Sequence, residues 1–168
     1  MYIDEQYEAA SKQLANDIKK FEASKRYKAT DLRIWYCATL NKLNRTADSI
    51  RALDLDNTAV PEAYEQRLLL NYTLSFYGNK KSIDDMLLYI GYIDEPKNDF
   101  TGRHFYGNFY LGLYYDSINN IELSENFLSI PCNSMKYKEN DMWFHLPRVL
   151  YDQRFNRQET REQGRGEV

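Results

Sequence analysis

The sequence predicts an all-α fold, a tetratricopeptide-like helical-hairpin solenoid of about eight helices. Apolar residues recur at three- and four-residue steps through most of the chain, and no segment sustains the two-residue alternation of a strand. Polar turns fall near Asn44, Asn79 and Asn119, about 35 and then about 40 residues apart, close to the roughly 34-residue period of tetratricopeptide repeats. We therefore expect three successive helical hairpins with one helix before them and one after. The predicted hairpins cover residues 30–53, 61–92 and 100–130.

The bulk composition fits one domain with a hydrophobic core, since 43% of the 168 residues are hydrophobic. We assign residues 1–155 to a helical-repeat domain. Residues 156–168, rich in Arg, Glu, Gln and Gly, are expected to form a polar, disordered tail. The net charge of -3 comes without a basic stripe, which argues against a nucleic-acid-binding protein. Tyr supplies 15 residues, and its large ring with a polar tip suits half-buried helix faces and partner surfaces.

The amphipathic pattern places the helices along the chain. Tyr7, Ala10 and Leu14 begin one apolar face of the first helix. The second helix, which contains Trp35 and Cys37, carries apolar residues on more than one side and is expected to be buried. The predicted helices cover residues 5–22, 30–43, 47–53, 61–77, 82–90, 100–117, 121–130 and 140–155.

Cap and stop residues define several helix ends. Thr30 or Asp31 is predicted to cap the second helix, because a short polar side chain can accept a hydrogen bond from a free first-turn N–H group. Ser82, followed three residues later by Asp85, predicts a near capping box at the start of the fifth helix. Pro131 is expected to stop the seventh helix, since it cannot donate a backbone hydrogen bond.

Turn-forming residues mark other ends. Pro61 suits the first turn of the fourth helix, and Gly78 with Asn79 suits a left-handed cap where that helix ends. A polar residue, Asn140 or Asp141, is expected to cap the eighth helix. Pro147 lies further along the same helix and predicts a kink there.

The sixth and seventh helices fit the tetratricopeptide signature best. Leu111 and Gly112 stand at its Leu-Gly position, Tyr115 follows three residues later, and Ser124 stands at the small position of the second helix. A Gly at this point lets the partner helix approach closely. The other two hairpins fit loosely, since the second has Asn71 in place of the Gly. The alternative is an ordinary bundle of helical hairpins.

The passage from Asn108 to Ser117 resembles the last repeat of the NlpI family, the tetratricopeptide-repeat lipoproteins of the Gram-negative outer membrane. The similarity continues through the turn at residues 119–120 and through Leu128, and residues 76–79 resemble the preceding hairpin turn of that family. In all it covers about residues 9–155, in the order of the C-terminal half of the family. The family's lipid-anchored N-terminus and first repeats have no counterpart in this sequence.

This resemblance implies a protein-interaction scaffold or adaptor that gathers a processing protease and peptidoglycan hydrolases at the periplasmic face of the outer membrane. The chain shows no signal peptide, no lipid-attachment Cys near its start and no apolar run of the roughly 20 residues that a membrane span requires. A membrane contact would therefore need an anchor outside it. If the chain is complete, we expect a cytoplasmic protein, and the alternative function is a small helical-repeat regulatory or inhibitor protein. Either function, adaptor or regulatory protein, is compatible with a homo-oligomer.

No catalytic, metal or cofactor motif is found in the sequence. His104 and His145 belong to no spaced ligand set or nucleophile–base pair, and Asp84 with Asp85 reads as helix-start charge rather than as an acid–base pair. Glycine-rich phosphate loops are absent. Cys37 and Cys132 are expected to be small buried hydrophobes, with a disulfide as the alternative if they meet in an oxidising compartment. We expect a protein that is not an enzyme and needs no cofactor or metal.

A partner-binding surface is the stronger functional prediction. In a hairpin solenoid, the first helix of each pair lines a concave side that receives peptides or partner domains. Tyrosines with a few charges beside them are typical of such surfaces, although the same tyrosines could instead pack between hairpins. The predicted concave-face residues are Tyr36, Thr39, Glu65, Tyr72, Tyr106 and Asp116.

Overall fold

The computed structural model describes residues 1–24, 29–53, 65–91, 102–133 and 142–156, which are all-helical apart from short turns and the N-terminal loop. The all-α prediction is confirmed for these ranges. No helix among them is long and apolar enough to span a membrane. The α-helices are α1 (Tyr7–Ser24), α2 (Thr30–Lys42), α3 (Thr46–Ala52), α4 (Glu65–Tyr77), α5 (Ile83–Ile90), α6 (Gly102–Ser117), α7 (Ile121–Asn133) and α8 (Met142–Tyr151), and a π-helical turn, η2 (Asp152–Asn156), follows α8.

The three predicted hairpins are formed by α2 with α3, α4 with α5 and α6 with α7, and the two helices of each pair pack against each other. All three turns have the same backbone geometry. Asn44, Asn79 and Asn119 have φ values of 57°, 57° and 60°, a left-handed conformation that Asn tolerates better than most residues. In each turn, the residue after the Asn donates its N–H group to the carbonyl five residues before it, as in a Schellman motif. These bonds join Arg45 to Leu40 at 2.9 Å, Lys80 to Ser75 at 2.8 Å and Asn120 to Tyr115 at 2.9 Å.

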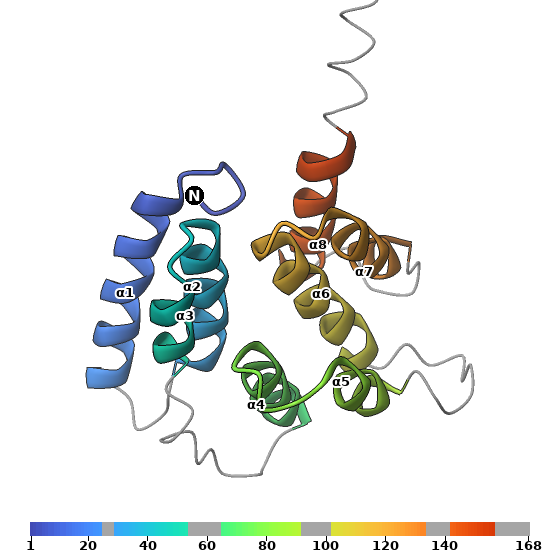
Figure 1. Cartoon of the computed structure of the whole chain (residues 1–168), viewed down its shortest axis with the longest axis horizontal. Coiled ribbons are helices and arrows are strands. Elements are labelled where there is room, and N and C mark those ends of the chain that lie inside the picture. Colours follow the sequence, from blue (N-terminus) through green and yellow to red (C-terminus); the bar gives the residue numbers. More distant parts are fainter. Residues whose placement is uncertain (25–28, 54–64, 92–101, 134–141, 157–168) are drawn as a thin grey trace, which may run out of the picture.

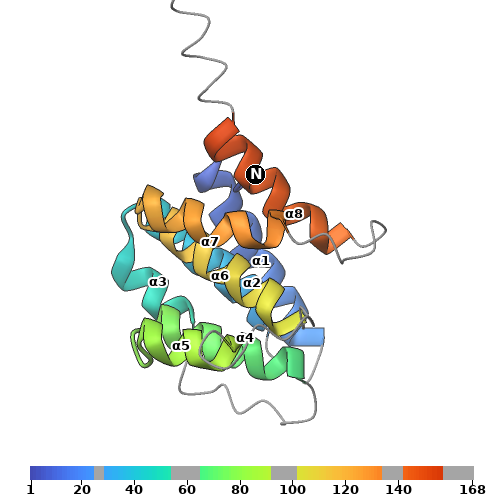
Figure 2. The ribbon, with the colours of Figure 1, turned by 90° about the vertical axis from the view of Figure 1, so that its right-hand side faces the viewer.

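The first helices of the hairpins meet in the centre of the molecule. Helix α2 packs against both α4 and α6, and α4 also packs against α6, while α1 covers α2 and α8 covers α7 (Figure 1). Figure 2 shows α4 and α5 lying across one end of α6. In an open solenoid, each repeat contacts its immediate neighbours alone. The contact of α2 with α6 therefore gives the hairpins a shared core, to which Ile34, Leu74 and Leu111 contribute fully buried side chains.

The close approach of α6 and α7 depends on Gly112. A Cβ atom at this position would lie 2.5 Å from Cγ of Leu128 and 3.1 Å from its backbone nitrogen, too close for a real side chain. The Ser124 hydroxyl donates to the Gly112 carbonyl at 3.1 Å, and the Tyr115 ring stacks on Phe127 with centroids 5.6 Å apart. The predicted close approach of the helices at Gly112 is confirmed, and Ser124 and Tyr115 both lie in this helix–helix seam.

Several predicted helix ends are also confirmed. Ser82 and Asp85 form a full capping box at the start of α5. Helix α5 ends at Gly91, whose φ of 89° is left-handed. Asn79, rather than the preceding Gly78, takes the left-handed conformation after α4. The predictions for Pro61, Asn140 and Asp141 lie outside the described residues, and so does the predicted tail at 156–168 except for Asn156, the last residue of η2.

Two predicted helix ends are wrong. Thr30 and Asp31 do not cap α2, because Ala29 occupies the N-cap position and no side-chain cap bond is formed there. Instead, the Ala29 N–H group donates to the Glu22 carboxylate at 3.1 Å, so the previous helix supplies the acceptor. Pro131 does not stop α7, which continues to Asn133. A proline so near the end of a helix removes one hydrogen bond and leaves few turns to disrupt.

The predicted helix at 140–155 is not α-helical to its end. The α-helical geometry ends at Tyr151, and the chain continues as the π-helical turn η2 to Asn156. Pro147 lies inside α8 and is buried. Arg154 lies within this π turn, and π turns are often found at functional positions.

Candidate functional site

The predicted concave-face residues do not form one surface. Thr39 is 0% exposed and Asp116 is 1% exposed, so the prediction that these two lie on an accessible face is wrong. The reason is the surroundings of α2 and α6, since α2 is packed against α1, α3, α4 and α6 and leaves no open groove over Thr39. Its hydroxyl donates to the Trp35 carbonyl at 2.7 Å. Tyr36, Tyr72 and Tyr106 are half-buried, and the Glu65 side chain lies outside the described part.

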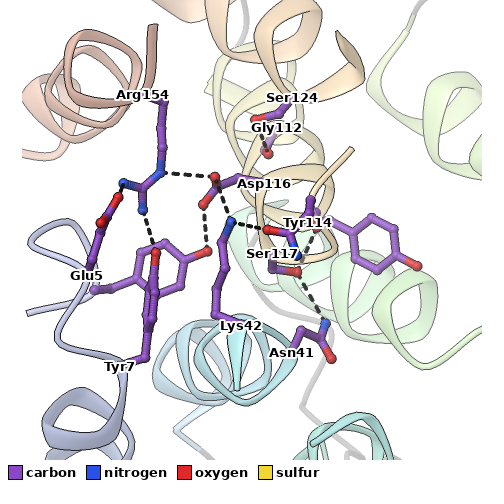
Figure 3. A network of polar contacts seen from close by, with 12 residues as sticks. Glu5, Tyr7, Asn41, Lys42, Gly112, Tyr114, Asp116, Ser117, Ser124 and Arg154 are labelled. Atoms are coloured by element: carbon purple, nitrogen blue, oxygen red, sulfur yellow. Dashed lines mark hydrogen bonds and ion pairs between the residues drawn. The ribbon is translucent and has the colours of Figure 1, made fainter. Parts of the chain in front are cut away.

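Asp116 is the centre of a buried polar network (Figure 3). One carboxylate oxygen accepts a hydrogen bond from the Tyr2 hydroxyl at 2.8 Å. The other lies 3.0 Å from Nε of Arg154 and 3.1 Å from Nζ of Lys42. All three donors come from segments far from α6 in the sequence, namely the N-terminal loop, η2 and the end of α2.

Arg154 extends this network to the N-terminal loop. Its Nη1 atom pairs with Glu5 at 2.9 Å, and its Nη2 atom donates to the Tyr7 hydroxyl at 3.1 Å (Figure 3). The Arg154 side chain is 9% exposed, whereas Glu5 is 68% exposed at the rim. One planar guanidinium therefore contacts the start of the chain and α6 at the same time, which suits the fixed fork of Arg.

The Asp116 network stabilises the fold, and its groups are not arranged for catalysis. Two cations, Lys42 and Arg154, share the single buried carboxylate of Asp116, and Glu5 supplies the second negative charge from the surface. Burial and the neighbouring Asp116 raise the pKa of Tyr2 well above its ordinary value, so its hydroxyl stays protonated and remains a donor. A carboxylate so enclosed and so fully engaged has no route to a substrate.

Sequence reasoning missed Tyr2, Lys42 and Arg154 as partners of Asp116. One signal was present, because Asp116 is the single acidic residue in the aromatic stretch from 102 to 117. A lone carboxylate among many large apolar side chains is expected to be buried and paired. Nothing in the local pattern could identify the partners, which lie 114 and 38 residues away for Tyr2 and Arg154.

A second constellation lies on α4, α5 and the first turn of α6. The rings of Tyr72 and Tyr89 stack with centroids 3.8 Å apart and planes 8° from parallel. The Lys81 ammonium lies 4.5 Å from the Tyr72 centroid, and the Arg103 guanidinium carbon lies 5.4 Å from the Tyr89 centroid. Because no cation fits between rings at 3.8 Å, each one covers an outer ring face. We call these four residues the tyrosine–cation stack.

The tyrosine–cation stack reaches the surface. Tyr72, Tyr89 and Lys81 are half-buried and Arg103 is exposed. Leu88, beside Tyr89 in α5, is 58% exposed. Tyr106 follows Arg103 by three residues, which makes the two neighbours along the surface of α6. Two of the predicted concave-face residues, Tyr72 and Tyr106, thus lie in or next to this surface.

The cations of the tyrosine–cation stack are not neutralised by the rest of the described chain. Neither Lys81 nor Arg103 forms an ion pair with any carboxylate in the described ranges. Asp85, four residues after Lys81, accepts hydrogen bonds from the Ser82 N–H group at 2.8 Å and from the Ser82 hydroxyl at 2.9 Å. These bonds, and more weakly Lys81, lower the pKa of Asp85.

The remaining titratable groups form no reactive cluster within the described ranges, where no group of three or more His, Cys, Asp and Glu side chains could hold a metal ion. His104 lies on α6 and His145 on α8, and partial burial lowers the pKa of His104. Cys37 is buried and Cys132 is half-buried, and both are free thiols rather than disulfide partners. Burial raises the pKa of each thiol to about 11, which keeps both protonated and unreactive near neutral pH.

Comparison with known proteins identifies no relative of the chain. No family model matches the chain, and searches of curated proteins and of solved structures find no significant match.

Proposed function

We propose that this chain is a non-enzymatic helical adaptor that binds a partner protein through the surface around the tyrosine–cation stack. One observation carries the proposal: two half-buried aromatic rings and two cations without ion pairs among the described residues converge there from α4, α5, α6 and the turn before α5. Tyr and Arg are enriched in protein interfaces, where large rings provide contact area at a low cost in side-chain entropy.

The repeated hairpin geometry supports the same proposal. The three hairpins share one turn geometry, and helical-hairpin arrays commonly present binding surfaces made by several hairpins together. The tyrosine–cation stack joins the second hairpin to the third in this way. On the resemblance of residues 108–117 to the NlpI family, the partners would be cell-envelope proteins such as a processing protease and peptidoglycan hydrolases.

Site-specific photo-cross-linking in the source cells tests this role. A photoreactive residue at Leu88, which is exposed beside the tyrosine–cation stack, should form a specific covalent adduct with a partner protein. The matched control places the same residue at Lys12, an exposed position on α1. The adduct from position 88 should disappear when Tyr72 and Tyr89 are both changed to Ala.

The circular dichroism spectrum of the double variant must stay helical for its result to count. Equal cross-linking from positions 88 and 12, or an adduct that persists in the folded Tyr72→Ala/Tyr89→Ala protein, would contradict the proposed surface. Mass spectrometry of the adduct identifies the partner and shows whether it belongs to the cell envelope.

A further inference from the structure

We infer that the partner segment recognised by the tyrosine–cation stack is acidic and carries two carboxylates, one for Lys81 and one for Arg103. This inference rests on the proposed function and adds the chemical class of the partner. It starts from the contrast with the Asp116 network, in which Lys42 and Arg154 are already paired with carboxylates inside the protein. Lys81 and Arg103 lack such partners in the described chain and lie at the surface.

The two cations are held in place rather than free in solvent. Each lies over the outer face of a ring, where the negative face of the aromatic system attracts it. The rings in turn are fixed by stacking on each other. A cation that is already positioned loses less side-chain entropy when it binds an anion, so this arrangement favours recognition of a carboxylate.

The rings themselves also favour an anionic partner. Their inner faces are covered by each other and their outer faces by Lys81 and Arg103. A partner can therefore reach the edges of the two rings rather than their faces. Ring edges carry partial positive charge, and the Tyr72 hydroxyl can donate a hydrogen bond, so both groups complement a carboxylate.

The geometry requires two carboxylates rather than one. Lys81 and Arg103 lie on opposite sides of the ring pair, with both ring thicknesses between them. A single carboxylate cannot pair with both cations across that separation. A segment with two acidic residues can place one at each end of the tyrosine–cation stack, with an apolar side chain against the exposed Leu88.

Selection of short random peptides displayed on phage against the immobilised protein tests this inference. Peptides that bind the wild-type chain should be enriched in Asp and Glu at two positions. Their affinity should fall roughly tenfold or more when Lys81 and Arg103 are both changed to Glu, since two attractive pairs become repulsive. A matched control, Lys12→Glu with Lys19→Glu on the exposed face of α1, adds the same charge and should leave the affinity nearly unchanged.

The outcomes separate this inference from the proposed function. Peptides that require Tyr72 and Tyr89 but show no acidic bias, or that bind the charge-reversed protein equally well, would overturn the acidic partner while keeping the binding surface. Peptides that ignore both tyrosines would overturn both. Binding of an RNA oligonucleotide as tightly as the acidic peptides would show general attraction of polyanions and would also overturn the inference.

Discussion

At the scale of single residues, Asp116 has the largest predicted effect on stability. Removing its charge leaves Lys42 and Arg154 close together without their shared carboxylate. We expect Asp116→Asn to lower the free energy of unfolding by about 3–5 kcal/mol, the usual cost of leaving a buried charge unpaired. Urea denaturation followed by circular dichroism measures this change.

Asp48 provides the matched control for this prediction. It also pairs with two basic side chains, Arg45 and Arg51, but all three lie at the surface, where solvent screens their attraction. Asp48→Asn should therefore change stability little. If the two substitutions had equal effects, burial of Asp116 would not be what makes its ion pairs important.

At the scale of helices, Gly112 determines how closely α6 and α7 pack. We expect Gly112→Ala to lower the free energy of unfolding by about 1–3 kcal/mol, because its new methyl group would overlap Leu128 and force the helices apart. Adding Leu128→Ala should make the double variant more stable than the sum of the two single effects predicts, since the methyl group then has room. Thermal denaturation of the four proteins measures this coupling, and strictly additive effects would contradict the proposed overlap.

The same scale shows what the sequence could predict. Hairpin turns and the α6–α7 seam were predictable because Asn44, Asn79, Asn119 and Gly112 act through their own backbone conformation or size. The start of α2 was not predictable, because Ala29 occupies the N-cap position and its N–H group bonds to Glu22 of the previous helix. Burial of Asp116 was missed for a similar reason. Helical spacing predicts which face a residue occupies, but whether that face is covered depends on contacts between segments distant in sequence.

For the candidate site, too, properties of single residues were predictable, whereas relations between residues on different helices were not. Tyr72 and Tyr106 are half-buried, as expected from the large ring and polar tip of Tyr. Tyr89, Lys81 and Arg103 were not identified, since their relation to Tyr72 exists only after α4, α5 and α6 have packed. Their capacity to bind a partner stays a prediction.

At the scale of the whole molecule, burial of weak acids predicts a loss of stability in alkali. Burial raises the pKa of Cys37 from its ordinary value of 9.0 to about 11, and it raises the pKa of Tyr2 and Tyr77 well above their usual range. A group whose pKa is higher in the folded chain binds its proton more tightly there. Its contribution to stability is complete below the unfolded pKa and is lost as the pH rises through the folded pKa.

Cys37 allows this effect to be measured for one group. We expect the free energy of unfolding to fall between pH 9 and about pH 11, with Cys37 accounting for about 2–3 kcal/mol of the loss once both states have ionised. Urea denaturation at several pH values should show a shallower decline for Cys37→Ala, although this variant is less stable near neutral pH because it loses a buried sulfur. Parallel declines for the two proteins would mean that the thiol does not stay protonated in the folded core. In the expected outcome, the loss of stability that Cys37→Ala still shows comes from the buried tyrosines and from Cys132, whose folded pKa is also about 11.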